Sequence, residues 1–385
     1  MLKIELIETE EELLALEGEW NAVLSRSLTN TFFQTFEWIR TWWEHFHQGR
    51  RLFTLVVKDD GRIIGIAPLM ITVQGAGPLK LRTLQLIGTG ALPFLGLGLA
   101  DRMDLIIADR AEEALSCIFD FIFKQRSRWD VMDLLFIPAQ SVTVEFIERL
   151  PQQYHCSVNK RLASRSPYVA LGSSYEEYLR SRSRNFRKKL ARSERLLSEH
   201  GDARFERHRG TESVAEVMNS VFAIAERSWK TEAASSLFQQ KPIANFFKSL
   251  AETVGRRGWF DVSLIKLADQ AVAYELCFSY NGRMLSYNCA YDSRYSNCSP
   301  GTLLTTFIIK NSIAEQLAEY DMLRGDEEYK LRFTDQLREE VQLVVYKKGL
   351  RSRIAYWLKF ALKWRLHKSK VVWAIHDRLA KLFNR

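Results

Sequence analysis

Long apolar runs, paired cysteines and an abundance of glycine and proline are all missing from this sequence of 385 residues. No stretch approaches the roughly 20 apolar residues of a membrane-spanning helix, so we expect no membrane span. With only 19 Gly and 8 Pro, a fibrous or mainly disordered chain is excluded. The five cysteines form no CxxC pair, which argues against a disulfide framework and indicates a reducing compartment.

Several motifs of common enzyme classes are also missing. The sequence contains no GxxxxGK[ST], no GxGxxG after an expected strand, no GxSxG and no HExxH. P-loop phosphate binding, hydride transfer, serine hydrolysis and zinc proteolysis therefore have no support. His45 and His47 stand among aromatic residues without further ligand spacing, so we expect no metal. The acidic first residues lack the features of a secretory signal, and we expect a cytoplasmic protein.

The positive charge is concentrated at the end of the chain. Residues 347–385 hold seven Lys and five Arg against one acid, whereas the whole chain has a net charge of +9. Apolar residues, among them Trp357 and Trp364, recur there at helical spacing. Trp with Lys and Arg is typical of a helix on an anionic membrane, here its inner face. Two alternatives stay open. One is a helix packed on its own domain, and the other is nucleic-acid binding.

A second basic segment extends from Arg180 to Leu196 and has eight Lys and Arg against one Glu. Phe186 and Leu190 maintain an apolar stripe, which predicts a helix with one buried and one cationic side. The cationic side is either an ordinary solvated face or a contact surface for a polyanion such as phosphate, nucleotide, RNA or a lipid headgroup.

Hydrophobic periodicity predicts an α/β (α+β) protein with mixed, mostly antiparallel sheets flanked by helices. Pro68 predicts an edge or a bulge in its strand. A hairpin occupies an equivalent place in each half, which indicates a weak internal duplication. We expect domains at 1–165 and 166–346, followed by the tail 347–385. The expected helices are 9–24, 34–47, 111–125, 182–197, 213–230, 242–258 and 302–320, and the expected strands are 52–57, 62–73, 81–87, 103–108, 131–137, 260–267, 271–280, 283–291 and 341–346.

A strand, a loop and a helix N-terminus follow one another over residues 283–310. The main-chain N–H groups and the dipole at such a helix start make an anion site. Gly301 would let a ligand approach the backbone closely, and Thr302 would cap the helix. An ordinary capped helix is the alternative. The candidate residues for anion binding are Asn297, Ser299, Gly301 and Thr302.

Glu275 is the candidate general base. Alternation along the strand places it on one face with small neighbours, where it would line a cleft. Burial would raise the pKa of its carboxyl group toward a range useful for deprotonating an amine or hydroxyl. The alternative is a carboxylate held structurally by a nearby Lys or Arg.

In this order and spacing, several stretches resemble the CelD-like acetyltransferase family of the GNAT superfamily, which is related to the Fem peptidyltransferases. The resemblance covers about residues 1–346. It implies tandem GNAT-like domains, with the donor site in the second, and acyl transfer from acyl-CoA to an amine or hydroxyl in surface polysaccharide or cell-envelope synthesis. The stretches are FFQTFEWIRTWW (32–43), RIIGIAPLM (62–70), RSRNFRKKLARSERLL (182–197), ERSWK (226–230), AVAYEL (271–276), AYDSRYSNCSPGTLL (290–304) and LRGDEEYKLRF (323–333).

One feature departs from the superfamily pattern. The loop at 297–302 has a single glycine, whereas the superfamily often carries a glycine-richer pyrophosphate loop. Two alternatives therefore stay open. One is a Fem-type transferase that uses aminoacyl-tRNA, and the other is a non-catalytic accessory protein at a polysaccharide synthase.

The loop after the last long helix supplies further candidates. Asp326 would orient the acceptor, and Lys330 would bind a phosphate or stabilise an oxyanion. The Fem resemblance supports a functional lysine there, and a salt-bridged loop is the alternative. The resemblance also places Trp229 and Lys230 at the site. Asp292 and Tyr329 complete the expected contacts with a small-molecule or glycan acceptor.

Overall fold

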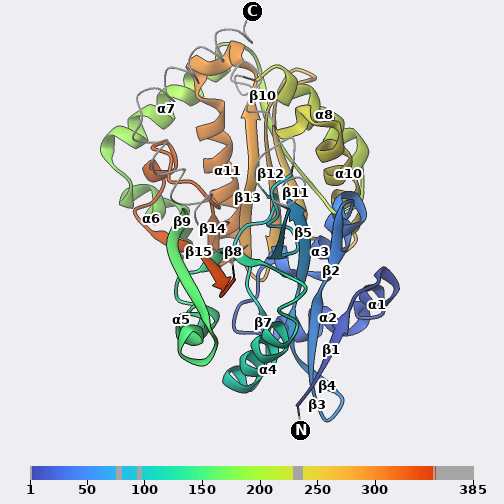
Figure 1. Ribbon diagram of the computed structural model, residues 1–385. Coiled ribbons are helices and arrows are strands. Elements are labelled where there is room, and N and C mark those ends of the chain that lie inside the picture. Colours follow the sequence, from blue (N-terminus) through green and yellow to red (C-terminus); the bar gives the residue numbers. More distant parts are fainter. Residues whose placement is uncertain (1, 75–79, 93–97, 229–236, 350–351, 353–385) are drawn as a thin grey trace, which may run out of the picture.

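The computed structural model describes residues 2–74, 80–92, 98–228, 237–349 and 352. The first half of the chain contains β1 (Leu2–Ile7), α1 (Glu10–Leu14), α2 (Glu17–Ser25), η1 (Phe32–Gln34), α3 (Phe36–Phe46), β2 (Arg50–Leu52), β3 (Thr54–Asp59), β4 (Arg62–Ala67), β5 (Leu69–Gln74), β6 (Leu81–Leu86), β7 (Ile106–Ile107), α4 (Ala111–Lys124), β8 (Val131–Pro138), α5 (Val142–Gln153) and β9 (Cys156–Ala170). Figure 1 shows how these elements are arranged.

The second half begins after β9. It contains α6 (Tyr175–Ser181), α7 (Arg184–Ser198), β10 (Ala203–Arg209), α8 (Val214–Glu226), η3 (Leu237–Gln239), α10 (Lys241–Gly255), β11 (Phe260–Leu267), β12 (Gln270–Tyr280), β13 (Arg283–Tyr291), η4 (Ser293–Cys298), α11 (Pro300–Ala314), β14 (Glu319–Asp321), η5 (Lys330–Arg332) and β15 (Leu337–Lys347). The order of strand, helices and antiparallel hairpin is the same for β1, β3 and β4 as for β10, β11 and β12.

The strands form two sheets. A four-stranded sheet has the order β1-β3-β4-β7, and an eleven-stranded sheet has the order β10-β11-β12-β13-β14-β9-β15-β8-β6-β5-β2. Between described strands, only the β13–β14 and β6–β8 pairs are parallel. The expected α/β fold with mixed, mostly antiparallel sheets flanked by helices is therefore confirmed.

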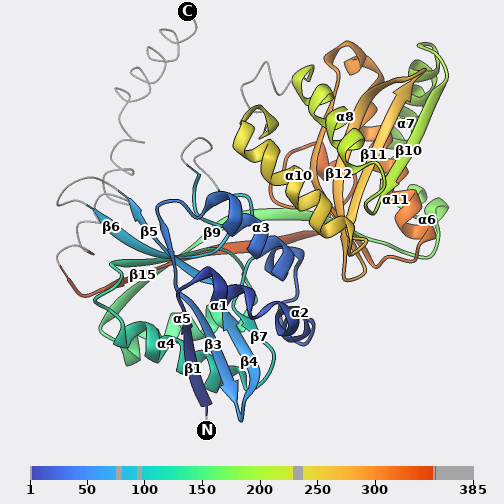
Figure 2. The ribbon, with the colours of Figure 1, turned by 90° about the vertical axis from the view of Figure 1, so that its right-hand side faces the viewer.

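Two long strands join the halves. β9 pairs with β15 along most of its length and with β14 at its end. β15, the last strand, also pairs with β8 of the first half, and Figure 2 shows β9 and β15 running from one half to the other. β9 thus runs through residue 165, where we placed the domain boundary, and that boundary stays a prediction.

Helices cover both faces of the second half's strands. α8 and α10 pack on one face and α11 with α7 on the other. α10 also packs on α3 of the first half, where the rings of Trp38 and Phe246 meet edge to face at 5.4 Å. Phe32 stacks on Phe278 with ring centroids 4.2 Å apart. Buried side chains of the two halves therefore share one core, and a second core lies between α7, α11 and the strands of the second half.

Most expected elements lie where the pattern places them, but several were wrong in extent. The expected strand 103–108 is only β7, two residues long, and the expected helix 9–24 is divided into α1 and α2. The expected helix 302–320 ends at Ala314, and the short strand β14 follows it. Gln316 adopts a left-handed φ of 58°, which ends the helix. The expected strand 62–73 is divided at Pro68, where the chain leaves the four-stranded sheet for the eleven-stranded sheet. Proline has no N–H for a sheet hydrogen bond, which suits this crossing point.

Two features are absent from the described ranges. No helix there is long and apolar enough to cross a bilayer. No group of three or more His, Cys, Asp or Glu side chains in these ranges is arranged to hold a metal ion. Residues 353–385, and with them most of the expected amphipathic tail, lie outside the described part of the chain.

Candidate functional site

The β12–β13 pair carries Glu275, and its register changes beside this residue. Glu275 lies opposite Cys289, and Leu276 lies opposite Asn288, but the next pair is Cys277 with Ser286. One extra residue of β13 therefore bulges between them. Such bulges re-aim side chains and are common next to active sites.

The other edge of β13 is only partly paired. β14 pairs with β13 from Arg283 to Leu285, and the chain then turns toward the first half, where Met322 N donates to Pro167 O at 2.9 Å. Beyond Leu285, no strand of the described chain pairs with this edge. Residues 286–289 belong to an inner strand of the eleven-stranded sheet, but they have no partner strand on this side. Their side chains are half-buried. We call these four residues the β13 edge.

The carboxylate of Glu275 is fully buried behind the β13 edge. Its Oε1 accepts hydrogen bonds from Ser286 Oγ at 2.7 Å and from the Tyr320 hydroxyl of β14. Its Oε2 accepts from Thr305 Oγ1 of α11 at 2.8 Å. Hydroxyl groups from three different elements thus satisfy this carboxylate, and no Lys or Arg of the described chain pairs with it.

Burial raises the pKa of Glu275 above its ordinary value, although the hydrogen bonds from Tyr320, Ser286 and Thr305 act in the opposite direction. Burial also raises the pKa of Tyr320 far above its ordinary value, so this phenol remains a donor. Glu275 is therefore a carboxylate that can both take up and release a proton nearer to neutral pH than an exposed Glu can.

Ser286 connects this buried carboxylate with the outside. Its side chain is on the β13 edge, which is half-buried, whereas Glu275 has no exposed surface. A ligand at this edge would reach Glu275 through the Ser286 hydroxyl. A proton can travel along this path from the ligand to Ser286 while Ser286 passes its own proton to Glu275.

The expected anion loop lies beside this pair. Ser299, in a left-handed conformation, precedes α11, and Pro300 is its first residue. The helix therefore begins two residues before Thr302, which we expected to cap it. Asn297 is exposed, whereas Ser299, Gly301 and Thr302 are half-buried. These four residues surround the positive end of a 15-residue helix.

Helix α11 brings the loop and the carboxylate together. Thr305, which donates to Glu275, is in the first turns of α11. A Cβ on Gly301 would lie 3.6 Å from the ring of Tyr291, which is an ordinary contact. The fold therefore has room for a small side chain at position 301. A ligand anion at the start of α11 would therefore lie about one helical turn from Thr305, which is hydrogen-bonded to Glu275.

Asp292 is in a different environment from the one expected. Its carboxylate is buried and accepts hydrogen bonds from Arg294 at 2.7 Å and from Arg227 at 3.2 Å. The hydrogen bond from Arg294 is the main cause that lowers the pKa of Asp292. Its oxygen atoms thus cap η4 and hold two arginines.

The loop 324–330 reaches the β13 edge at Tyr329. Lys330 is buried, and its Nζ donates to the carbonyl oxygens of Arg324 at 2.7 Å and Gly325 at 3.1 Å. Glu327 completes its environment at 3.0 Å. The ammonium group therefore stabilises the conformation of this loop by donating hydrogen bonds to two of its main-chain carbonyls. The salt bridge is with Glu327 rather than with Asp326.

Tyr329 and Asp326 of this loop have surroundings that differ from those of Lys330. Tyr329 interacts with Cys289 of the β13 edge, and desolvation by the surrounding protein is the main cause that raises its pKa. Asp326 is exposed and has no hydrogen bond or ion pair with the described residues. Trp229 and Lys230 lie outside the described residues.

The sequence did not single out Ser286, Thr305 or Tyr320. Alternation along β12 identified the face of Glu275, but its hydroxyl partners come from three other elements. A signal existed only for Thr305, which lies one helical turn after Gly301 on the predicted helix. The bulge that aims Ser286 at the carboxylate has no sequence signature of its own.

Comparison with known proteins identifies part of the chain. Residues 184–331 match the family model described as the acetyltransferase (GNAT) domain. This range includes α7, Glu275, the start of α11 and the loop 324–330, and it is less than half of the chain. No curated protein matches the sequence.

Solved structures with little sequence identity share the fold over almost the whole chain. FemX has 12% identity and a TM-score of 0.61, and the match covers 92% of this chain and 99% of FemX. The C-terminal domain of a candidate lysylphosphatidylglycerol synthetase from Agrobacterium fabrum has 11% identity and a TM-score of 0.55, with 89% and 94% covered. A conserved protein of unknown function from Bacteroides thetaiotaomicron has 11% identity and a TM-score of 0.53, with 90% and 100% covered.

The domain match agrees with the geometry of the site. A buried carboxylate with a proton path to an open strand edge, beside the start of a helix, suits acyl transfer from a phosphate-bearing donor. The match of residues 184–331 to the GNAT acetyltransferase domain supports an acyltransferase.

Proposed function

We propose that the protein transfers an acyl group, most simply acetyl, from acyl-CoA to an amine or hydroxyl acceptor. One observation carries this proposal. Ser286 at the open β13 edge is hydrogen-bonded to buried Glu275, which also accepts from Thr305 of α11. The donor phosphates would bind at Asn297–Thr302, so that the thioester carbonyl lies along the β13 edge.

In the proposed reaction, the acceptor nitrogen or oxygen attacks the thioester carbonyl directly. The acceptor gives its proton to Ser286 as Ser286 gives its own proton to Glu275. The tetrahedral intermediate then collapses, the C–S bond breaks, and the leaving CoA thiolate takes up the proton that Glu275 returns through Ser286. The products are the amide or ester and free CoA, and no covalent enzyme intermediate forms.

The loop 324–330 would hold the acceptor. Asp326 is exposed and unpaired within the described chain, so it can contact an amine or a sugar hydroxyl. Lys330 is committed to the carbonyls of Arg324 and Gly325. We therefore propose that Lys330 positions this loop, in place of the direct contact with an oxyanion or a phosphate that we first expected. Tyr329 would line the acceptor side.

The resemblance to the CelD-like family supports a surface-glycan or cell-envelope acceptor. Release of CoA thiol from acetyl-CoA, measured over a panel of amino sugars and sugar alcohols, tests the reaction. We expect one acceptor class to accelerate release and Glu275→Gln to remove that acceleration. Release that is equally fast with Glu275→Gln and with the wild type would rule out the proposed base.

A second candidate, aminoacyl transfer from tRNA, is favoured by the exposed face of α7. Arg184, Lys188, Lys189 and Arg192 are exposed and have no hydrogen bond or ion pair from their side chains to the described chain. Such a row of free cations suits a phosphate backbone, and its binding would weaken steeply with salt. Salt-sensitive tRNA binding, together with no binding of acyl-CoA, would favour this candidate.

For residues 347–385, we propose a peripheral contact with an anionic membrane. The support is the composition of this segment, in which Trp accompanies many Lys and Arg. Ser352 Oγ donates to Asp130 O at 2.6 Å, so a chain that ends at residue 352 keeps this anchor. Sedimentation with anionic vesicles should be weakened in that shortened chain, and unchanged sedimentation would contradict the proposal.

A further inference from the structure

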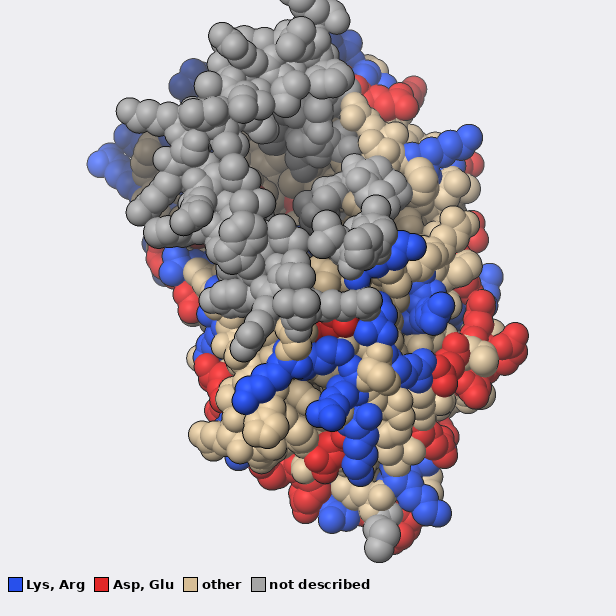
Figure 3. Space-filling view, in the orientation of Figure 1, with Lys and Arg blue, Asp and Glu red and all other residues tan. Residues whose placement is uncertain are grey.

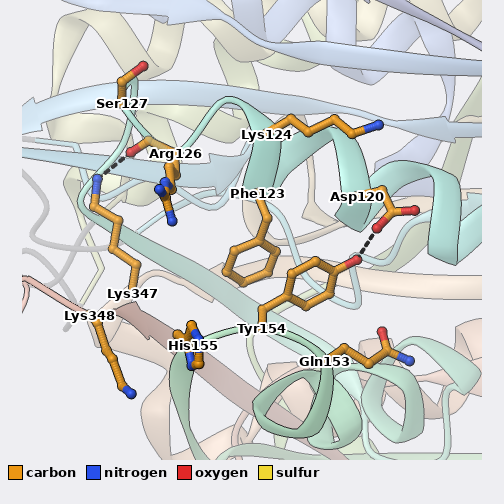
Figure 4. Close-up of a pocket in the computed structure, with 10 residues that line it drawn as sticks. All are labelled: Asp120, Phe123, Lys124, Arg126, Ser127, Gln153, Tyr154, His155, Lys347 and Lys348. Atoms are coloured by element: carbon orange, nitrogen blue, oxygen red, sulfur yellow. Dashed lines mark hydrogen bonds between the residues drawn. The ribbon is translucent and has the colours of Figure 1, made fainter.

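A groove of about 840 Å³ lies far from the β13 edge, in the first half of the molecule. Its walls are the end of α4, the turn that follows it, the end of α5 with the start of β9, and the end of β15. Figure 4 shows these side chains, and we call this feature the β15 groove. It is lined by Asp120, Phe123, Lys124, Arg126, Ser127, Gln153, Tyr154, His155, Lys347 and Lys348.

Three cations of the β15 groove are free to bind. Lys124, Arg126 and Lys348 are exposed, and their side chains have no hydrogen bond or ion pair with the described residues. They come from three different segments: α4, the following turn and the residue after β15. The acidic residue of the lining, Asp120, already accepts a hydrogen bond from the Tyr154 hydroxyl.

Lys347 has a different role. Its Nζ donates to the carbonyl oxygens of Arg126 and Trp129, and burial lowers its pKa. This lysine ties the end of β15 to the turn after α4 and so fixes the free cations relative to one another. The groove is therefore a shaped feature with a charged rim.

The floor of the β15 groove is aromatic. The rings of Phe123 and Tyr154 stack with centroids 4.1 Å apart and planes 5° apart, and both side chains are half-buried. In Figure 4 they lie side by side, with Lys124 above them and Lys348 at the lower left. Aromatic rings beside Lys and Arg are the combination found at the headgroup level of a bilayer.

The groove lies at the end of β15, the last described strand before the basic end of the chain. β15 ends at its rim, and Ser352 is still held against Asp130 O. The sequence from 353 onward supplies nine further Lys and Arg. Figure 3 shows Lys and Arg gathered on the lower half of the face toward which β15 ends. The groove therefore lies where the described chain leads into its basic end.

We propose that the β15 groove binds the phosphate headgroups of anionic phospholipids at a membrane surface. Lys124, Arg126 and Lys348 would contact the phosphates, and Phe123 with Tyr154 would lie at the level of the glycerol. The groove would thereby fix one orientation of the protein on the membrane. This inference does not depend on the acyl transfer, because vesicle binding is measured without donor or acceptor.

The test uses the full chain and vesicles of phosphatidylglycerol and phosphatidylcholine in equal parts. The groove variant is K124Q/R126Q/K348Q. The matched control is K3Q/R62Q/R256Q, which removes the same number of exposed cations that have no ion pair with the described residues. We expect the groove variant to bind the vesicles at least about tenfold more weakly and the control to change binding by less than about twofold.

Several results would overturn the proposal. One is no loss of vesicle binding in the groove variant, and another is an equal loss in both variants, which would indicate charge alone. A third is full displacement from the vesicles by inorganic phosphate at constant ionic strength, which would indicate a soluble-phosphate site. A fourth is loss of tRNA binding in the groove variant with vesicle binding intact. Circular dichroism of both variants verifies that they fold.

Discussion

Ser286 Oγ and Glu275 Oε1 are 2.7 Å apart, and only one of these two residues is accessible from outside. The Glu275 side chain is fully buried, whereas Ser286 is at the point where β13 and β14 part. The bulge in β13 creates this pairing. An unbroken register would place Tyr287 opposite Cys277, but in the observed register Ser286 takes that position. The pair supplies the proton path of the proposed reaction.

Removing the Ser286 hydroxyl should interrupt this path. We expect Ser286→Ala to lower kcat by about 10²-fold or more, the usual contribution of general acid–base catalysis. KM for the donor should change little, because the donor phosphates bind at the start of α11. Steady-state kinetics measure both constants. A kcat within about twofold of the wild-type value would show that protons reach Glu275 by another route.

The pH dependence of the reaction follows from the raised pKa of Glu275. A base must be deprotonated to act, so the rate should rise with pH through the pKa of Glu275. Because burial raises this pKa, the rise should lie above pH 4.5, the ordinary value for Glu. In Glu275→Gln this acidic limb should vanish together with most of the rate. A limb that persists in Glu275→Gln would belong to another group.

Lys330 should act on stability and loop position. Lys330→Met leaves the carbonyls of Arg324 and Gly325 without their donor, which costs about 1 to 3 kcal/mol of unfolding free energy. Lys188→Met on the exposed face of α7 is the control and should change this free energy by less than about 0.5 kcal/mol. Denaturant unfolding measures both. Equal effects of the two changes would remove the positioning role.

Arg102 joins the halves through buried charges. Its guanidinium pairs with Asp321 of β14 and lies 3.5 Å from Glu340 of β15. Arg102→Ala should cost about 3 kcal/mol of unfolding free energy, because it leaves buried carboxylates without this partner. Arg110 has the same φ of 46° but an exposed ion pair with Asp59, so Arg110→Ala should cost less than about 1 kcal/mol. Denaturant unfolding of the two variants compares these costs, and similar losses would mean that the buried pair does not hold the halves together.

The sequence predicted the local elements of the fold better than the connections between its halves. Local patterns identified α3, α4, β11, β12 and β13, through apolar residues at helical spacing in the helices and apolar runs bounded by turns in the strands. The pairing of β15 with β8 and β9 joins residues far apart along the chain, and no local pattern encodes such pairing. β9 itself escaped prediction because its exposed N-terminal part alternates weakly.

The candidate site also combines residues that local sequence signals identify with residues whose role depends on tertiary contacts. Glu275 and the start of α11 carry local signals: a charged residue within an apolar strand, and Pro-Gly before a helix. Asp292 and Lys330 looked equally functional in the sequence, yet their polar atoms are used by arginines and by main-chain carbonyls. Which polar group is already satisfied depends on tertiary contacts, and composition does not reveal it.

Calorimetric titration with acetyl-CoA tests the central claim most directly, with the wild type, Gly301→Ala and Gly301→Trp side by side. A Cβ at position 301 has ordinary space beside Tyr291, so Gly301→Ala should fold normally and serve as the control for Gly301→Trp. We predict saturable binding to the wild type that is lost in Gly301→Trp. No binding of acetyl-CoA to the wild type, or unchanged binding to Gly301→Trp, would contradict a donor site at the start of α11.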